Sequence, residues 1–91
     1  MSTWLITGCS TGLGRALAEA VFAAGHNVVV TARDVGTVAD LADASPEHAL
    51  AVTLDVTKPD QIAAAIQQAH ERFGSVDVLV NNAGYGYRAA V

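Results

Sequence analysis

Residues 7–14 read TGCSTGLG and follow directly on the short apolar run Trp4-Leu5-Ile6. Three glycines fall within the seven residues from Gly8 to Gly14. Glycine loses more backbone entropy on folding than any other residue, so a cluster of glycines is costly unless the chain needs it. The need is usually an unusual backbone conformation or a ligand that must approach the backbone closely. The elements around the stretch indicate which of the two applies.

The rest of the chain alternates between short apolar runs and segments in which apolar residues recur at helical spacing. The runs predict strands over residues 4–6, 27–31, 50–54 and 76–80. Between the strands we predict three helices. The first ends at Gly25 and has the apolar residues Leu13, Ala16, Leu17, Ala20, Val21 and Ala24, and the second is a weak helix over residues 38–43. The third ends at Gly74 and has the apolar stripe Ile62, Ile66, Ala69 and Phe73. Thr57 with Asp60 resembles a capping box at the start of the last helix.

The predicted elements alternate regularly between strand and helix. The strands are nearly continuous apolar runs, which is typical of a parallel sheet that helices cover on both faces. Right-handed crossovers then predict a doubly wound α/β fold with strand order 3-2-1-4. In that order the fourth strand lies at an edge, although its apolar residues favour burial. We therefore expect residues 1–91 to be the first part of a longer protein.

Composition and charge argue against several classes of function. The 91 residues allow one domain at most, and 52% of them are hydrophobic while 15% are charged. The net charge of -4 without a basic block argues against nucleic-acid binding. No apolar run approaches the roughly 18 residues of a membrane span, and the N-terminus lacks a cationic secretory signal. The single cysteine, Cys9, cannot form an internal disulfide, so we expect a cytoplasmic protein.

The glycine-rich stretch lies between the first strand and the first helix, where a parallel sheet opens a crevice at the carboxyl ends of its strands. A helix N-terminus presents unpaired N–H groups and a partial positive charge there, so an anion such as a diphosphate is the natural ligand. Gly8 permits the turn, Gly12 leaves room for the diphosphate, and Gly14 allows close packing of the helix. Ser10 and Thr11 add hydroxyl donors. The alternative is a tight turn that binds nothing.

Three motifs, taken together, resemble those of the classical short-chain dehydrogenase/reductases. Residues 7–14 are similar to the family's glycine motif, residues 81–84 (NNAG) to its Asn-Asn-Ala-Gly motif, and Asp55-Val56 to its adenine-contacting Asp. The resemblance covers essentially the whole chain, but only the first part of a family member, which runs to about 250 residues in one domain. It implies a Rossmann-type fold and the binding of NAD(P)(H) by residues 1–91.

The resemblance also implies a reaction and a set of cofactor-binding residues. The family interconverts the alcohol and carbonyl forms of small molecules by hydride transfer at the nicotinamide, and its members often form homo-oligomers. Asp55 and Val56 would flank the adenine, and Asn82 would lie toward the nicotinamide ribose. The implied cofactor-binding residues are Gly8, Ser10, Thr11, Gly12, Leu13, Gly14, Arg33, Asp55, Val56, Asn82, Ala83 and Gly84.

The choice between NADP(H) and NAD(H) depends on the end of the second strand. An acidic residue about 20 positions after the glycines binds the ribose hydroxyls of NAD, whereas a nearby Arg accommodates the 2′-phosphate of NADP. Counting 20 positions from Gly12 leads to Ala32, followed by Arg33, whose guanidinium matches phosphate geometry. We therefore predict NADP(H). Asp34 lies 20 positions after Gly14 and leaves NAD(H) as the alternative.

The family's catalytic Tyr and the Lys four residues after it have no match in this chain. Tyr85 and Tyr87 are followed at that distance by Ala89 and Val91, so we expect the catalytic residues beyond Val91. This chain alone is then expected to be inactive. A non-catalytic dinucleotide sensor is the alternative function, and an inert structural fragment is the third.

Other reactive residue types have simpler structural interpretations. Cys9 occupies a variable position of the glycine motif, and only helix N–H groups facing it would make its thiol reactive. His26, His48 and His70 fall in different predicted elements without metal-ligand spacing, so no metal is predicted. Asp77 lies near the start of the fourth strand, where we expect a solvated charge rather than a catalytic residue.

Overall fold

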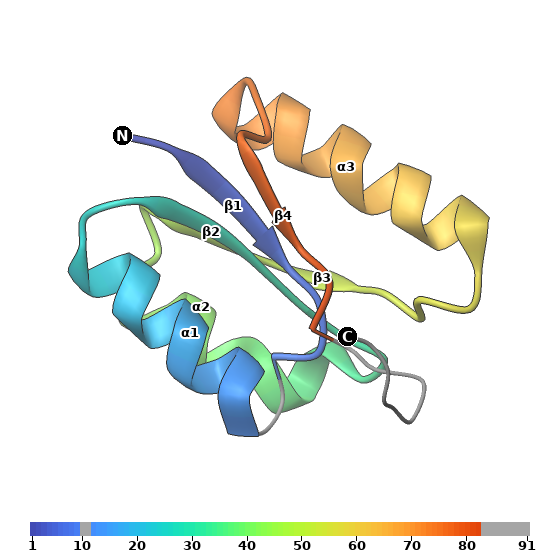
Figure 1. Ribbon diagram of the computed structural model, residues 1–91, viewed down its shortest axis with the longest axis horizontal. Coiled ribbons are helices and arrows are strands. Elements are labelled where there is room, and N and C mark those ends of the chain that lie inside the picture. Colours follow the sequence, from blue (N-terminus) through green and yellow to red (C-terminus); the bar gives the residue numbers. More distant parts are fainter. Residues whose placement is uncertain (10–11, 83–91) are drawn as a thin grey trace.

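The computed structural model describes residues 1–9 and 12–82, which form one parallel sheet flanked by helices (Figure 1). The strands are β1 (Thr3–Ile6), β2 (Asn27–Ala32), β3 (Ala49–Thr53) and β4 (Val78–Val80). The helices are α1 (Gly12–Ala23), α2 (Ala39–Ala44) and α3 (Pro59–Phe73), with the 3-10 helix η1 (Val35–Val38) leading into α2. The strand order β3-β2-β1-β4, with parallel pairing throughout, confirms the predicted doubly wound α/β fold.

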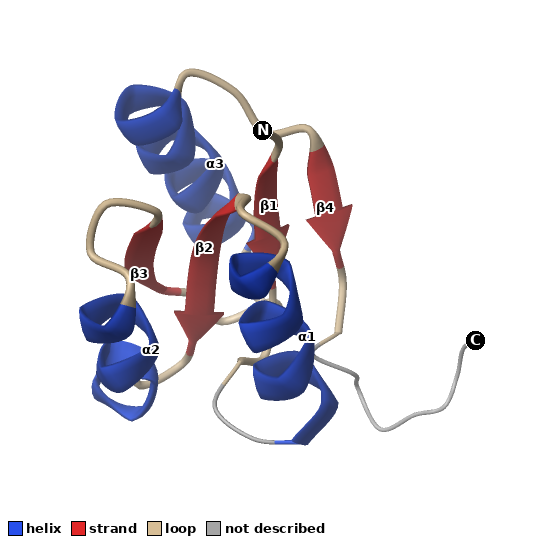
Figure 2. Cartoon of the chain, turned by 90° about the vertical axis from the view of Figure 1, so that its left-hand side faces the viewer, coloured by secondary structure: helices blue, strands red, loops and turns tan. Residues whose placement is uncertain are grey.

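Helices α1 and α2 cover one face of the sheet, and α3 covers the other (Figure 2). Successive residues of β2 therefore alternate between two hydrophobic clusters. Val28 and Val30 join the cluster under α1 and α2, whereas Val29 joins the cluster under α3. Because both faces of the central strands are buried, their sequences are continuously apolar, as the prediction assumed.

Helix α1 presents only part of the predicted apolar stripe, Leu17 and Val21, to the sheet. Gly14, Ala18 and Val21 are buried, whereas Leu13 is 76% exposed. The predicted apolar positions Ala16, Ala20 and Ala24 are also exposed. Small residues thus line much of the contact with the sheet, which lets the helix lie close to the strands.

The glycines that were predicted to end the first and last helices do so. Gly25 and Gly74 each adopt a φ of 88°, just past the ends of α1 and α3. This left-handed conformation is the usual way in which a glycine ends a helix. The N–H of Gly74 also donates to the carbonyl oxygen of His70 at 2.8 Å, which satisfies one of the last carbonyls of α3.

The predicted capping box of Thr57 and Asp60 is wrong. Lys58 precedes the first turn of α3, and no side chain among the described residues caps that turn. The hydroxyl of Thr57 donates to Asp55 Oδ1 instead, at 2.6 Å. Helix α3 begins at Pro59, whose fixed φ suits the first helical position and which has no N–H to satisfy. The proline therefore takes the place of a side-chain cap.

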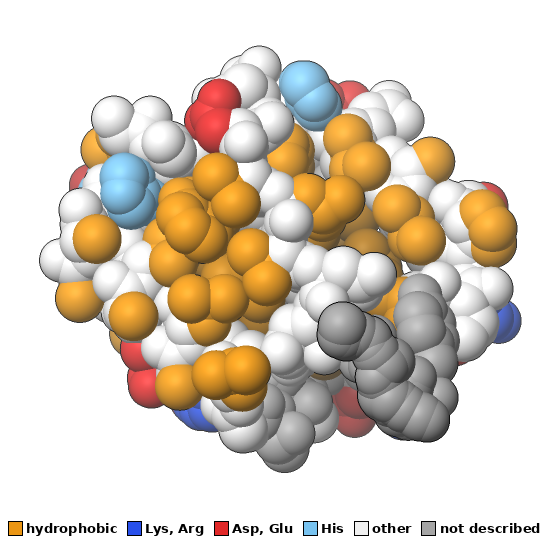
Figure 3. Space-filling view, in the orientation of Figure 1, with side chains coloured by type: hydrophobic (Ala, Val, Ile, Leu, Met, Phe, Trp, Pro, Cys, Tyr) orange, Lys and Arg blue, Asp and Glu red, His pale blue; other side chains and the backbone are white. Residues whose placement is uncertain are grey.

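Strand β4 is shorter than the predicted residues 76–80 because its pairing with β1 begins only at Val78. Trp4 pairs with Val78, and Val76 packs instead against the cluster under α3. One edge of β4 has no neighbouring strand among the described residues. Leu79 on this strand is 55% exposed, and Figure 3 shows hydrophobic side chains gathered over the middle of the face where Figure 1 draws β4. The predicted apolar edge is thus present.

Candidate functional site

The predicted site residues in the described part of the chain gather where the strands end. Gly8 follows β1, Arg33 follows β2, Asp55 follows β3 and Asn82 follows β4. The carboxyl ends of parallel strands meet at one edge of the sheet, and this edge is where α/β proteins of this topology bind ligands. The remaining predicted residues Ser10, Thr11, Ala83 and Gly84 lie outside the described residues.

The turn after β1 is tied to the end of β4 by Thr7 and Asn82. The N–H of Thr7 donates to the Val80 carbonyl at 3.0 Å, and its hydroxyl accepts from the Asn82 N–H at 2.8 Å. The Asn82 side chain in turn donates from Nδ2 to the Gly8 carbonyl at 3.2 Å. Thr7 was not among the predicted site residues. Its position directly after β1 and before Gly8, beside the strand that precedes Asn82, is the signal that could have indicated its role.

Gly14 occupies a position that only glycine can fill. A Cβ atom there would lie 2.2 Å from the Gly8 carbonyl oxygen and 2.4 Å from Asn82 Nδ2, which is closer than real Cβ atoms approach. The first turn of α1 therefore packs directly on the turn after β1. This is the close packing that the sequence predicted for Gly14.

Gly12 stands at the start of α1 beside open space. Its φ is +59°, and a Cβ atom built there would meet nothing within 4 Å among the described residues. The amides of the first helical turn have no partner within the helix, and they carry its partial positive charge. A diphosphate fits such a place, because donors converge there and no side chain at Gly12 obstructs the approach.

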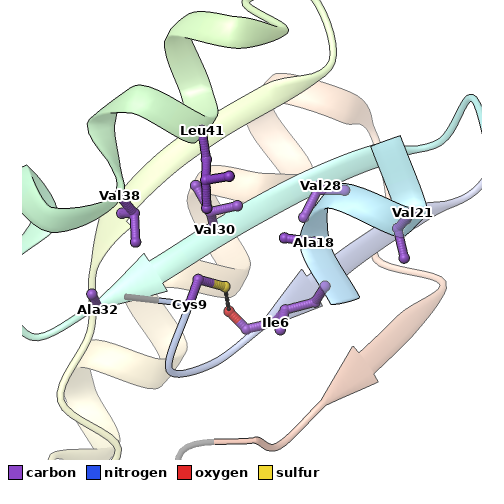
Figure 4. Close-up of a cluster of buried hydrophobic side chains, with 9 residues drawn as sticks. All are labelled: Ile6, Cys9, Ala18, Val21, Val28, Val30, Ala32, Val38 and Leu41. Carbon is purple, nitrogen blue, oxygen red and sulfur yellow. Dashed lines mark hydrogen bonds between the residues drawn. The ribbon is translucent and has the colours of Figure 1, made fainter. Parts of the chain in front are cut away.

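The start of the glycine turn is also held against β2. The N–H of Cys9 donates to the Thr31 carbonyl at 2.9 Å, and the Thr31 hydroxyl donates to the Ile6 carbonyl at 2.9 Å. Figure 4 shows the Cys9 thiol, which donates to the same Ile6 carbonyl at 3.1 Å. Cys9 is fully buried, and this burial raises the pKa of its thiol. The thiol is therefore a packing group rather than a reactive one, as the sequence analysis expected.

Strand β2 ends in a buried alanine followed by an exposed arginine. The Ala32 carbonyl accepts from the Leu54 N–H at 2.9 Å, which joins the end of β2 to the segment after β3. Arg33 is exposed and has no carboxylate partner within residues 1–9 and 12–82. The ion pair in these residues joins Arg15 of α1 to Asp40 of α2 instead. The Arg33 guanidinium is thus available to an external anion on this edge.

Asp34 caps the helical segment that follows β2. Its Oδ1 accepts from the Gly36 N–H at 3.0 Å, and its backbone carbonyl accepts from the Thr37 N–H at 3.0 Å and the Thr37 hydroxyl at 2.7 Å. Its own backbone is extended, as is usual for a residue that caps a helix N-terminus. This cap explains why the helical segment begins at Val35, as η1, before the predicted residue 38.

Asp55 forms a compact turn after β3. Its Oδ1 accepts from the N–H of Thr57 at 2.9 Å as well as from the Thr57 hydroxyl, while its own N–H donates to Gln61 Oε1 at 2.8 Å. The hydroxyl and N–H of Thr57 lower the pKa of the Asp55 carboxyl, and the charges of Lys58 and Arg33 lower it further. Val56, next in sequence, packs against the cluster under α3.

The described part of the chain contains neither a metal site nor a membrane-spanning helix. No group of three His, Cys, Asp or Glu side chains is placed to share a metal ion there. No helix in the same residues combines the length and hydrophobicity needed to cross a lipid bilayer.

Asp77 is exposed and accepts from the Thr3 N–H at 2.9 Å, so it joins the starts of β1 and β4.

Together, the parallel sheet and the glycine turn at its carboxyl edge define a Rossmann-type α/β protein. The family model of the short chain dehydrogenases matches residues 2–91, so the chain belongs to this family of oxidoreductases. Its members bind NAD(P)(H). The resemblance of the three sequence motifs to this family is thereby confirmed.

Relatives and solved structures agree with this assignment. Oxidoreductase BOA17 of Botryotinia fuckeliana is 45% identical over 89 residues, which are 97% of this chain and 32% of that protein. A short-chain dehydrogenase from Streptomyces avermitilis is 49% identical with a TM-score of 0.86, over 92% of this chain and 32% of that one. A 3-ketoacyl-(acyl-carrier-protein) reductase from Brucella melitensis, complexed with NADH, is 37% identical with a TM-score of 0.87, over 98% and 37%. The chain thus spans about a third of these proteins' length.

Proposed function

We propose that residues 1–91 are the cofactor-binding part of a longer, single-domain, NADP(H)-dependent short-chain dehydrogenase/reductase. The complete enzyme interconverts the alcohol and carbonyl forms of a small molecule. The cofactor, when bound, supplies the hydride donor or acceptor for this reaction. The role of the described residues is to bind and orient it.

The diphosphate is assigned to the N-terminus of α1. Support comes from the open space beside Gly12 and from Gly14, which has no room for a Cβ atom and brings the first turn against Gly8. A side chain at either position would block the ligand or push the helix off the turn. Ser10, Thr11 and Leu13 are the other residues that we assign to this subsite. Leu13 is 76% exposed and lies in the first turn of α1.

The other parts of the cofactor are assigned to the ends of the remaining strands. Asp55 and Val56, after β3, flank the adenine. Asp55 Oδ1 is engaged by Thr57, which holds the carboxylate in one orientation at the edge of the sheet. Asn82 lies after β4, toward the nicotinamide ribose, and Ala83 and Gly84 continue this subsite.

The preference for NADP(H) rests mainly on Arg33. This residue is exposed at the carboxyl end of β2, without a carboxylate partner in the described residues, and the preceding position holds the buried Ala32 instead of an acid. A guanidinium at this position attracts the 2′-phosphate of NADP. Position 32 has no carboxylate that could accept hydrogen bonds from the ribose hydroxyls of NAD. The structure of the Brucella melitensis relative contains NADH, and this describes the cofactor of that relative and not of the present chain.

Replacing Arg33 tests this proposal in the full-length protein. Arg33→Ala should raise the Kd of NADPH by about 30-fold, because a charge-assisted pair with phosphate is lost. The Kd of NADH should change less than about twofold, since NADH has no 2′-phosphate. Fluorescence titration of each reduced cofactor measures both values. Arg72→Ala removes the same charge from the far end of α3 and serves as the control. Equal losses for NADPH and NADH would contradict the assignment.

We also propose a cellular location and an oligomeric state for the full-length protein. We assign it to the cytoplasm because the one cysteine of residues 1–91, Cys9, is a buried free thiol rather than half of a disulfide. We also expect the full-length enzyme to form a homo-oligomer, as its family usually does.

A further inference from the structure

We infer that Asp34 is a positioning residue, which sets the cofactor preference by holding Arg33 at the carboxyl edge instead of binding the ribose itself. The inference rests on the proposed function, because it concerns the subsite of the 2′-phosphate. It assigns a role to the one acidic residue that the sequence left as a candidate for the NAD(H) ribose.

The backbone around Arg33 is restrained on both sides. On one side, the Ala32 carbonyl accepts from the Leu54 N–H at 2.9 Å. On the other, Asp34 receives three hydrogen bonds from Gly36 and Thr37, at 2.7 to 3.0 Å. Arg33 is the one residue between these two anchors. Its side chain is exposed, so the restrained backbone on either side is what holds the base of this side chain at the edge of the sheet.

One oxygen of the Asp34 carboxylate is already engaged in this arrangement. A carboxylate that binds a ribose diol needs its oxygens directed away from its own chain, toward the ligand. Asp34 Oδ1 is instead directed along the chain, toward the Gly36 N–H at the start of η1. A Cβ atom on Gly36 would lie 3.3 Å from the same oxygen, so the carboxylate also packs closely on that turn.

The charge of Asp34 then has an effect distinct from its cap. It lies one residue from Arg33, so a negative charge at this position repels a 2′-phosphate bound there. A neutral residue that still accepts from Gly36 should keep the loop in place and bind NADPH more tightly. A residue without an acceptor should release the loop and bind NADPH less tightly.

Three substitutions in the full-length protein separate these effects. Asp34→Ala removes both the acceptor and the charge, and we expect it to raise the Kd of NADPH about fivefold with less than about twofold change for NADH. Asp34→Asn and Asp34→Ser keep a cap acceptor without the charge, and should bind NADPH at least as tightly as the parent does. Asp43→Ala removes an exposed carboxylate from α2 and controls for charge alone.

A double variant tests whether Asp34 acts through Arg33. In the Arg33→Ala background, Asp34→Ala should not weaken NADPH binding further, because the group that it positions is gone and only the repulsion by the Asp34 charge is removed. The inference is overturned if Asp34→Ala weakens NADPH as much with Arg33 absent as with Arg33 present. It is also overturned if Asp34→Asn weakens NADH, which would make the carboxylate a ribose ligand, or if Asp34→Ala leaves NADPH affinity unchanged.

Failure of the proposed function gives a different result. In that case Arg33→Ala by itself leaves the ratio of NADPH to NADH affinity unchanged, and the inference falls with the proposed function. If Arg33→Ala changes the ratio and Asp34→Ala does not, the proposed function stands and the inference alone is wrong.

Discussion

At the amino ends of the strands the polar groups pair with one another, whereas at the carboxyl ends several of them border open space. The Ser2 N–H donates to His26 Nδ1 at 3.0 Å, and His48 Nδ1 lies 2.9 Å from Asn27 Oδ1. These contacts, with the bond from Thr3 to Asp77, satisfy polar groups of this end within the protein. At the other end, the helix start at Gly12 and the side chain of Arg33 face outward.

The difference separates groups that hold the fold from groups that are available to a ligand. A hydrogen bond within the protein stabilises the fold modestly, and it leaves nothing for a ligand to bind. The carboxyl end has internal bonds as well, but these position the backbone. Thr7, Thr31, Asp34 and Asn82 tie down the turns that carry the exposed groups. Changes at the two ends should therefore affect binding and stability differently.

The largest effect is expected at Gly14. Gly14→Ala places a Cβ atom 2.2 Å from the Gly8 carbonyl oxygen, so the first turn of α1 must move away from the turn after β1. We expect a loss of stability of about 3 kcal/mol and a Kd for NADPH raised by about a hundredfold. Thermal unfolding and fluorescence titration of the full-length protein measure the two effects.

A glycine far from the site provides the matched control for Gly14. Gly25 has a φ of +88° at the end of α1, with nothing within 4 Å of a Cβ atom built there. Gly25→Ala should cost about 1 kcal/mol through backbone strain and leave NADPH affinity unchanged. If both alanine variants lose affinity equally, the loss reflects general destabilisation, and the contrast between the two ends is not supported.

A smaller effect is expected at the amino end, from Asp77. Asp77→Ala removes the acceptor of the Thr3 N–H at the start of β1. The Tm should fall by about 2–4 °C, as for one modest hydrogen bond in a protein of the length of the relatives. The Kd of NADPH should stay the same, because the change lies at the opposite end of the strands. A weakened affinity together with an unchanged Tm would reverse the roles proposed for the two ends.

The smallest effect concerns the titration of Asp55. Because the folded state lowers the pKa of this carboxyl, the stabilisation is present above the ordinary pKa of Asp and is lost as pH falls through the lowered value. Thr57→Ala removes the largest cause, so the pKa of Asp55 should rise toward its ordinary value. An NMR titration of the Asp55 carboxyl in both proteins measures this. An unchanged pKa would show that Thr57 is not the cause.

The outcome of the predictions differed between elements for physical reasons. The ends of α1 and α3 were predicted correctly, because glycine ends a helix by a local conformational preference. The exposed face of α1 was not predicted correctly, because alanine at helical spacing suits either the core or the surface. Only contact with the sheet decides which of these alanines are buried. The length of β4 depended on which of its residues pair with β1, which is a property of the pairing and not of either segment.

The candidate site divides in the same way. The positions of Gly8, Arg33 and Asp55 could be predicted because each comes just after a strand, and the ends of parallel strands share one edge. Two contacts could not be predicted: the cap formed by Asp34 and the hydrogen bond from Asn82 to the Gly8 carbonyl. Side-chain partners of this kind depend on distances that packing sets. For the same reason, the capping box proposed for Thr57 proved to be a turn around Asp55.

The amino-acid sequence by itself determined the family, the order of the elements and the edge of the sheet that carries the glycines, because these follow from periodicity and from motifs at strand ends. Only the tertiary structure decided which polar groups hold the turns and which face outward. Both kinds of residue have the same chemistry in the sequence. They differ in whether the folded chain brings a partner within hydrogen-bonding distance.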